Sequence, residues 1–284
     1  MNLAVKEANL QEIEKQMTVD GIETNYLEAG AGNKETMVLI HGSGPGVSAF
    51  ANWRLVIPRL SETFHVFAPD VIGFGKTAKL EENEYGLDVW VNHLIKFIEE
   101  VADGPVHIVG NSFGGAMALQ IAHRRPDLIN KLILMGTVGV KHELSHGLQK
   151  VWGYDPSIEN MRELIKLFSY NQEAANNEEL VKLRYEASME PESKEAFHNM
   201  FYNNQQERLD ELSLEDEEIK QIEKETILFH GLEDQVIPFE ATSYKLMKLL
   251  PNAELHLFNQ CGHWTQIEKT EPFIDHILAF TKGE

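Results

Sequence analysis

The sequence predicts an α/β fold: a buried, mostly parallel sheet with helices on both faces and a helical insertion. Three observations support this prediction. Apolar, strand-like runs alternate with amphipathic, helix-like segments along most of the 284-residue chain. The alternation fails in one long stretch, residues 141–212. A serine stands in a glycine-rich turn, Gly110–Gly114, between a strand-like run and a helix-like one.

In chain order, a β-hairpin is expected first, at residues 16–28, because the alternating pattern breaks at Asp20-Gly21. Six further apolar runs have the length and composition of buried strands: Thr36–His41, His65–Pro69, Val106–Gly110, Lys131–Gly136, Thr226–Gly231 and Glu254–Phe258. Helix-like segments lie between most of them, near residues 51–61, 87–102, 114–124, 239–249 and 264–281. Together these runs predict an eight-stranded sheet flanked by helices.

Residues 141–212 are polar and helical in character, rich in Asn, Glu and Gln, with scattered large apolar side chains such as Trp152 and Phe168. The alternative is a mobile acidic loop region, but a structureless stretch of this length would be unusual in a compact domain. We therefore expect residues 141–212 to form a helical cap. The cap would be inserted into an α/β core made by residues 1–140 and 213–284.

Composition excludes several classes of partner. The formal charge of −20 argues against nucleic acid and anionic membranes. An anionic substrate would need a local basic residue to offset that field. A single cysteine, Cys261, rules out an intrachain disulfide. The segment MNLAVKEANLQEIEK lacks the apolar stretch of a secretory signal, and no uncharged apolar run reaches 18 residues. A cytoplasmic protein without a membrane span is expected.

Ser112 is the candidate nucleophile. It stands in Gly110-Asn111-Ser112-Phe113-Gly114, between the run VHIVG and an alanine-rich, helix-like segment. That context is typical of a nucleophile elbow, in which a sharp strand-to-helix turn presents a serine hydroxyl above a parallel sheet. The glycines permit the strained turn and the close helix–strand contact. The context makes catalysis a better interpretation than an ordinary strand–loop–helix connection.

A serine hydroxyl needs a base, and the base needs an orienting acid. The expected chain order is serine, acid, histidine. Glu233 and Asp234 follow the strand-like run TILFHG, and His263 follows ELHLF. Its position makes His263 the candidate base. The residues alone do not decide whether Glu233 or Asp234 is the acid, and Asp234 could instead be a turn or helix-cap carboxylate. Cys261 lacks an elbow and is interpreted as a small packing residue.

Hydrolysis also requires hydrogen-bond donors for a developing oxyanion. The glycine-rich run His41–Gly46 follows a strand and can supply them, which makes the amides of Ser43 and Phe113 the candidate donors. A phosphate-binding loop is excluded by spacing, because Val47 and Asp70 stand where glycines would be needed. No metal-binding spacing joins the histidines. Serine chemistry needs neither a metal nor an organic cofactor.

These residues resemble the α/β-hydrolase superfamily and, more closely, the meta-cleavage product hydrolases, in particular the 2-hydroxymuconate semialdehyde hydrolases. The resemblance spans nearly the whole chain. Its most specific strings are HGSGPGVSAFANWR (41–54), GNSFGGAMALQIA (110–122), LILMGTVGV (132–140), WGYDPSIENMR (152–162), EDQVIP (233–238) and CGHWTQIE (261–268). The resemblance implies a triad of Ser112, Asp234 and His263. It implies oxyanion amides at Ser43 and Phe113, and a substrate site lined by Gly42, Asn52, Asn111, Arg184 and Trp264.

The resemblance implies a serine-dependent hydrolase that cleaves a carbon–carbon bond in the meta-ring-fission products of aromatic degradation. The products would be 2-hydroxypenta-2,4-dienoate and a small carboxylic acid, which is formate for the semialdehyde. Arg184 makes chemical sense here, because a planar guanidinium can hold a carboxylate beside a 2-oxo or enol oxygen. Arg184 could instead be a surface arginine on a cap helix, and Trp264 could be a core aromatic. The resemblance also implies at least a homodimer.

Several alternatives stay open. The same residues would serve a general carboxylesterase or thioesterase, and a ligand receptor could retain the fold with little turnover. Haloalkane dehalogenases and epoxide hydrolases are disfavoured because they use aspartate where this chain has Ser112. The residues do not distinguish an acyl-enzyme from a gem-diol route. They also leave open whether the scissile end carries an aldehyde, a methyl, a larger alkyl or a phenyl group.

Overall fold

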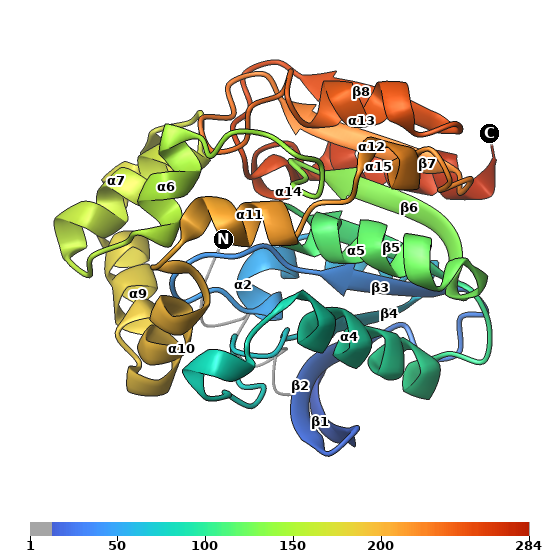
Figure 1. The fold of residues 1–284 in the computed structure, drawn as a ribbon, viewed down its shortest axis with the longest axis horizontal. Helices are drawn as coiled ribbons and strands as arrows, with labels where there is room; N and C mark the ends of the chain where they lie inside the picture. The colour runs from blue at the N-terminus through green and yellow to red at the C-terminus, as the bar shows by residue number, and fades with distance from the viewer. Residues whose placement is uncertain (1–12, 284) are drawn as a thin grey trace.

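The computed structural model describes residues 13–283 and contains one eight-stranded sheet (Figure 1). The strand order is β1-β2-β4-β3-β5-β6-β7-β8. The first two pairings, β1–β2 and β2–β4, are antiparallel, and all others are parallel. The strands are β1 (Glu14–Val19), β2 (Ile22–Ala29), β3 (Thr36–Ile40), β4 (His65–Pro69), β5 (Val106–Asn111), β6 (Ile129–Met135), β7 (Thr226–Gly231) and β8 (Ala253–Phe258).

The expected hairpin is formed by β1 and β2. Asp20 and Gly21 connect the strands with φ of +49° and +82°. Positive φ at both central residues is the signature of a type I′ turn, whose twist matches that of the paired strands. The hairpin therefore adds two strands to one edge of the sheet, of which β2 runs against all the others.

Helices cover both faces of the sheet because successive strand residues face opposite layers and both sets are apolar. In β6, Leu132 and Leu134 belong to one buried cluster, whereas Ile133 and Met135 belong to the other. The first layer holds α4 (Leu87–Val101), α5 (Phe113–Arg124), α12 (Asp216–Ile219) and α13 (Ser243–Leu249). The second holds α2 (Ala49–Trp53), α3 (Ile57–Leu60) and α15 (Thr270–Lys282). The short helix α14 (Thr265–Glu268) precedes α15, and two 3₁₀ turns span Glu82–Glu84 and Pro126–Leu128.

Between β6 and β7, the chain forms a run of helices that lies beyond one end of the sheet (Figure 1). They are α6 (His146–Trp152), α7 (Ile158–Phe168), α8 (Glu173–Asn176), α9 (Glu178–Ser188), α10 (Pro191–Phe201) and α11 (Gln205–Glu211). Their large apolar side chains, including Trp152, Phe168 and Phe201, are buried and continuous with the α4–α5 layer of the core. The helices therefore extend the hydrophobic core over that end of the sheet.

Two expected helices are each divided in two. The segment 51–61 contains α2 and α3, separated at Arg54–Val56, and the segment 264–281 contains α14 and α15. Pro58 lies in the first turn of α3, where its missing N–H is tolerated, and it prevents one continuous helix. At the second break, Lys269 has φ −128° and ψ 42°, outside the helical region.

In the described part of the chain, no helix is long and apolar enough to cross a membrane. The expectation that the N-terminal segment holds no secretory signal falls mostly on residues 1–12, which lie outside the described residues.

Candidate active site

Ser112 lies at the junction of β5 and α5 with φ 52° and ψ −111°, a backbone conformation that few non-glycine residues adopt. The Ser112 amide donates to the Met135 carbonyl at 2.9 Å, and the Ser112 carbonyl accepts from the amides of Gly115 and Ala116. These bonds hold the strained residue between the sheet and the helix that follows. The geometry is that of the predicted elbow.

The glycines around Ser112 are required by close packing. A Cβ at Gly110 would approach the Gly114 carbonyl oxygen to 2.6 Å, and a Cβ at Gly114 would approach the Ile40 carbonyl oxygen to 2.2 Å. Neither contact is sterically possible without movement of the backbone. The elbow therefore forms only because α5 can approach β3 and β5 without intervening side chains.

The structure brings Asp234 and His263 together, at the ends of β7 and β8. His263 Nδ1 lies 2.8 Å from Asp234 Oδ2, and both side chains are almost completely buried. Glu233, the other acid in the loop, instead accepts from the Cys261 amide at 2.9 Å and holds the two loops together. Geometry thus selects Asp234 as the partner of the histidine. If His263 donates from Nδ1, its Nε2 is left to accept a proton.

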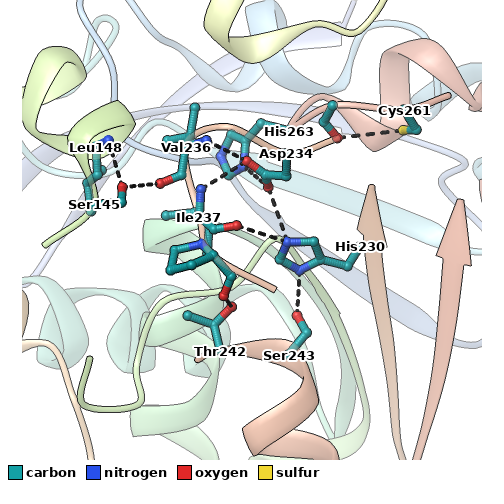
Figure 2. A network of polar contacts seen from close by, with 12 residues as sticks. Ser145, Leu148, His230, Asp234, Val236, Ile237, Thr242, Ser243, Cys261 and His263 are labelled. Atoms are coloured by element: carbon teal, nitrogen blue, oxygen red, sulfur yellow. Dashed lines mark hydrogen bonds and ion pairs between the residues drawn. The ribbon is translucent and has the colours of Figure 1, made fainter. Parts of the chain in front are cut away.

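Asp234 receives hydrogen bonds from several directions (Figure 2). Its Oδ1 accepts from the amides of Val236 and Ile237 at 2.8 and 2.9 Å. Burial acts to raise the pKa of the Asp234 carboxyl, but His263, His230 and the Ile237 amide outweigh it and hold that pKa below its usual value. Asp234 is therefore ionised at neutral pH and available to orient an imidazole.

His230 forms the other side of this network. Its Nε2 lies 3.1 Å from the Ile237 carbonyl oxygen and 3.4 Å from Asp234 Oδ2, and its Nδ1 lies 2.8 Å from Ser243 Oγ. A carbonyl only accepts, so the His230 proton is assigned to Nε2. Burial lowers the pKa of His230, which keeps the ring neutral. We call His230, Asp234 and His263 the carboxylate cluster.

Ser112 and His263 converge on the end of β6. Gly136 follows Met135, whose carbonyl holds the Ser112 amide, and a Cβ on Gly136 would lie 2.9 Å from the His263 ring. Among residues 13–283 the structure has no hydrogen bond between the Ser112 hydroxyl and His263.

The His41–Gly46 loop lies against the elbow: a Cβ at Gly42 would approach the Ser112 Cβ to 3.4 Å. In the described chain, the amides of Ser43 and Phe113 donate to no protein acceptor. Two such N–H groups beside a serine are suited to binding an oxyanion. Trp152, from α6, donates its Nε1–H to Ser43 Oγ at 3.0 Å and connects the inserted helices to this loop.

Asn52 and Asn111 lie side by side beneath this loop. Asn52 Oδ1 accepts from the Gly42 amide and from Asn111 Nδ2, both at 3.1 Å. The Asn111 Oδ1 atom is buried without a hydrogen-bond partner in the described protein. An unpaired buried polar atom beside Ser112 calls for a ligand or water donor.

Trp264 and Arg184 line one pocket of about 80 Å³ together with Asn52 and Arg54. Trp264 stacks on Phe168 of α7, with ring centroids 4.9 Å apart and planes inclined by 9°. The Arg184 guanidinium, from α9, contacts the Pro45 carbonyl at 3.4 Å, and its Nε is buried without a partner in the described protein. We call Arg54 and Arg184 the arginine cluster.

Cys261 is completely buried, and burial raises the pKa of its thiol to about 12. It is therefore an uncharged packing residue at neutral pH, as predicted. In the described part of the chain, no three His, Cys, Asp or Glu side chains are grouped as metal ligands.

Sequence reasoning missed three contributors to the site: His230, Arg54 and the tie from Trp152 to Ser43. His230 could have been noticed because it precedes Asp234 by four residues at the end of the same strand. Arg54 stands two residues after Asn52 in a string already singled out. The Trp152 contact joins residues 109 positions apart, and no local signal announces it.

Comparison with known proteins places the chain in a family. Residues 35–270 match the family model of the alpha/beta hydrolase fold. The chain is 45% identical to 2-hydroxy-6-oxo-2,4-heptadienoate hydrolase of Pseudomonas putida, over 96% of this chain and 98% of that one. It is 43% identical to 2-hydroxymuconate semialdehyde hydrolase of a Pseudomonas species, over 96% and 95%.

Solved structures give the same result. A variant of the meta-cleavage product hydrolase of Pseudomonas fluorescens IP01, complexed with acetates, superposes with a TM-score of 0.92 at 44% identity, covering 96% of this chain and 99% of that one. The 2-hydroxy-6-oxo-6-phenylhexa-2,4-dienoate hydrolase of a Rhodococcus species has a TM-score of 0.88 at 32% identity, covering 95% and 98%. The chain therefore belongs to the α/β-hydrolase family and, within it, to the meta-cleavage product hydrolases.

Proposed function

We propose that this protein hydrolyses a carbon–carbon bond in 2-hydroxy-6-oxo-2,4-dienoic acids and uses Ser112, Asp234 and His263 as its triad. One observation carries the proposal. The buried Asp234–His263 pair, with Oδ2 and Nδ1 2.8 Å apart, lies at the same edge of the sheet as the strained Ser112 elbow. The chemistry also fits the names of relatives with 45% and 43% identity.

Each group has a defined part. His263 Nε2 takes the proton of the attacking hydroxyl, while Asp234 orients the ring and stabilises its charged form. The amides of Ser43 and Phe113 receive the developing oxyanion. Ketonisation of the conjugated dienol first creates an electron sink. Water is then consumed and the C–C bond breaks, giving 2-hydroxypenta-2,4-dienoate and a carboxylic acid. No metal or organic cofactor is required for these steps.

Substrate binding is assigned to Gly42, Asn52, Asn111, Arg184 and Trp264. Arg184 would hold the substrate carboxylate, and its Nε, buried without a partner among residues 13–283, supports that role. Residues 141–212 would act as the cap, since α9 carries Arg184 and α7 carries Phe168 against Trp264. For the scissile end we propose a small substituent, an aldehyde or a methyl group, because the 45% and 43% relatives are named for such substrates.

The test is loss of dienol absorbance after mixing the protein with 2-hydroxymuconate 6-semialdehyde or 2-hydroxy-6-oxohepta-2,4-dienoate. We expect rapid bleaching, reduced at least about 10³-fold in Ser112→Ala. Parallel reactions use p-nitrophenyl acetate. Ester turnover without bleaching would move the protein to the carboxylesterases. Tight dienoate binding without turnover, retained in Ser112→Ala, would identify a ligand receptor.

We also propose a cytoplasmic location and a homodimer or larger homo-oligomer. The meta-cleavage family suggests the assembly. Exposed apolar side chains at the β8 end of the sheet, Leu232 and Leu257, are compatible with a subunit contact. Sedimentation equilibrium measures the assembly directly, and a monomer of about 32.3 kDa would overturn it.

A further inference from the structure

Arg54 and Arg184 reach the same pocket from different parts of the fold. Arg54 ends α2 in the α/β core, and Arg184 belongs to α9 of the inserted helices. Both side chains are half-buried, and both line the pocket of about 80 Å³ beside Asn52 and Trp264. A water molecule occupies about 30 Å³ in the liquid, so this space accommodates a carboxylate-sized group.

Neither guanidinium has a carboxylate partner among residues 13–283, although 45 acidic residues are present in the chain. Arg54 donates to the Ala51 carbonyl, and Arg184 has only a 3.4 Å contact with the Pro45 carbonyl. The other five arginines behave differently. Arg59, Arg124, Arg125, Arg162 and Arg208 each pair with at least one acid. The arginine cluster is therefore the exception in this chain.

Two neighbouring cations removed from water cost free energy unless something compensates them. Burial, followed by the positive charge of Arg54, lowers the pKa of Arg184 to about 10. Burial also lowers the pKa of Arg54. An anion seated between the two guanidiniums would relieve both penalties and satisfy the orphaned Arg184 Nε.

We propose that Arg54 is a second anion-binding residue, which works with Arg184 to grip a carboxylate and the oxygen on its neighbouring carbon. The ligand class is a 2-oxo or 2-enol monocarboxylic acid, and this inference rests on the proposed function. With two guanidiniums, one can bind the carboxylate bidentately while the other donates to the oxygen on the neighbouring carbon. Because one cation comes from the core and one from the inserted helices, the bound acid also joins those two parts.

The pair further explains how an acidic protein accepts an acidic substrate. With a formal charge of −20, the surface repels anions at long range. Two adjacent positive charges in a partly desolvated pocket produce a local field that is screened less by salt than the surface charges. Arg54 thus doubles the local charge at the point where the anion is held.

The experiment is isothermal titration calorimetry with 2-oxobutanoate and, as an uncharged probe, methyl 2-oxobutanoate. The full-length wild type is compared with Arg54→Gln, Arg54→Lys and the matched control Arg59→Gln, whose arginine is paired on the surface. We expect the wild type to prefer the acid at least tenfold. Arg54→Gln should weaken acid binding about tenfold and ester binding little, Arg54→Lys should retain part of the affinity, and Arg59→Gln should resemble the wild type.

Unchanged acid binding in Arg54→Gln would overturn the proposal, as would equal losses for acid and ester or no acid preference in the wild type. Circular dichroism and thermal melting of each variant establish folding, and Arg54→Lys provides a second variant if Arg54→Gln does not fold. Failure of the proposed function has a separate signature. The wild type would then bind 2-oxobutanoate through both arginines yet bleach no dienoate substrate.

Discussion

Trp264 follows His263 of the carboxylate cluster and lines the pocket of the arginine cluster, yet the two clusters are built on opposite principles. In the carboxylate cluster, Asp234 receives hydrogen bonds from His263 and two backbone amides, with His230 close by. In the arginine cluster, two cations share a pocket, and neither is paired with a carboxylate of the described residues. The protein itself supplies hydrogen-bond partners for Asp234, whereas Arg184 keeps a donor without a partner among the described residues.

The difference follows from the proposed tasks. Proton transfer needs donors and acceptors held in place before the reaction, because reorganisation during the reaction would raise the barrier. Recognition of an anion needs donors that the protein itself leaves unsatisfied. Substitutions in the two clusters should therefore change stability in opposite directions.

The largest effect is expected for Asp234→Asn. The neutral amide replaces the carboxylate that accepts the hydrogen bond from His263 Nδ1 and cannot stabilise an imidazolium. We therefore expect kcat for the dienoate to fall about 10³- to 10⁴-fold. Loss of the buried network should also lower the free energy of unfolding by about 1–3 kcal/mol. Stopped-flow absorbance and urea unfolding measure these quantities. A fully active Asp234→Asn variant would remove Asp234 from the triad.

Arg184→Met should show the opposite effect on stability. Removing the substrate's anion partner should raise KM for the dienoate about 10- to 100-fold. Replacing a half-buried cation by an apolar side chain should stabilise the unliganded protein by about 1–3 kcal/mol. Steady-state kinetics and thermal melting without ligand test both parts. A lower melting temperature in Arg184→Met would break the contrast between the two clusters.

His230→Gln tests the outer part of the carboxylate cluster. We expect kcat to fall about tenfold with little change in KM, because a looser Asp234 orients His263 less well. Stability should fall by about 1–3 kcal/mol, since the Ser243 hydroxyl and the Ile237 carbonyl lose a buried partner. His230→Asn, which also replaces the ring by an amide, is the control for loss of the ring. Equal kcat values in wild type and His230→Gln would reduce the residue to a packing role.

The smallest effect is a pH dependence confined to the arginine cluster. The pKa of Arg184 is lowered to about 10, so its positive charge is present below that pH and is lost as the pH rises through it. KM for the dienoate should therefore increase above about pH 10. KM for p-nitrophenyl acetate, which carries no carboxylate, should not follow. Parallel increases for both substrates would point to general loss of structure.

The contrast between the clusters also separates what was predictable from what was not. The positions of Ser112, Asp234 and His263 were predictable because each follows a strand, and parallel strands bring their carboxyl ends to one edge. The sheet itself was predictable because strands such as β6 are apolar on both faces. Helix ends were harder to predict: residues 51–61 divide at Arg54–Val56, where the effect of Pro58 competes with the apolar pattern.

By itself, the sequence determined the eight-stranded α/β architecture, the strained serine turn and the placement of Ser112, Asp234 and His263 at strand ends, because periodicity and glycine positions act locally. Only the tertiary structure decided between Glu233 and Asp234, tied Trp152 to Ser43 and put Arg54 beside Arg184. Arg54 and Arg184 are 130 positions apart, and no periodic pattern connects a core helix with an inserted one. Their meeting depends on how the inserted helices pack over the end of the sheet, which is a property of the whole fold.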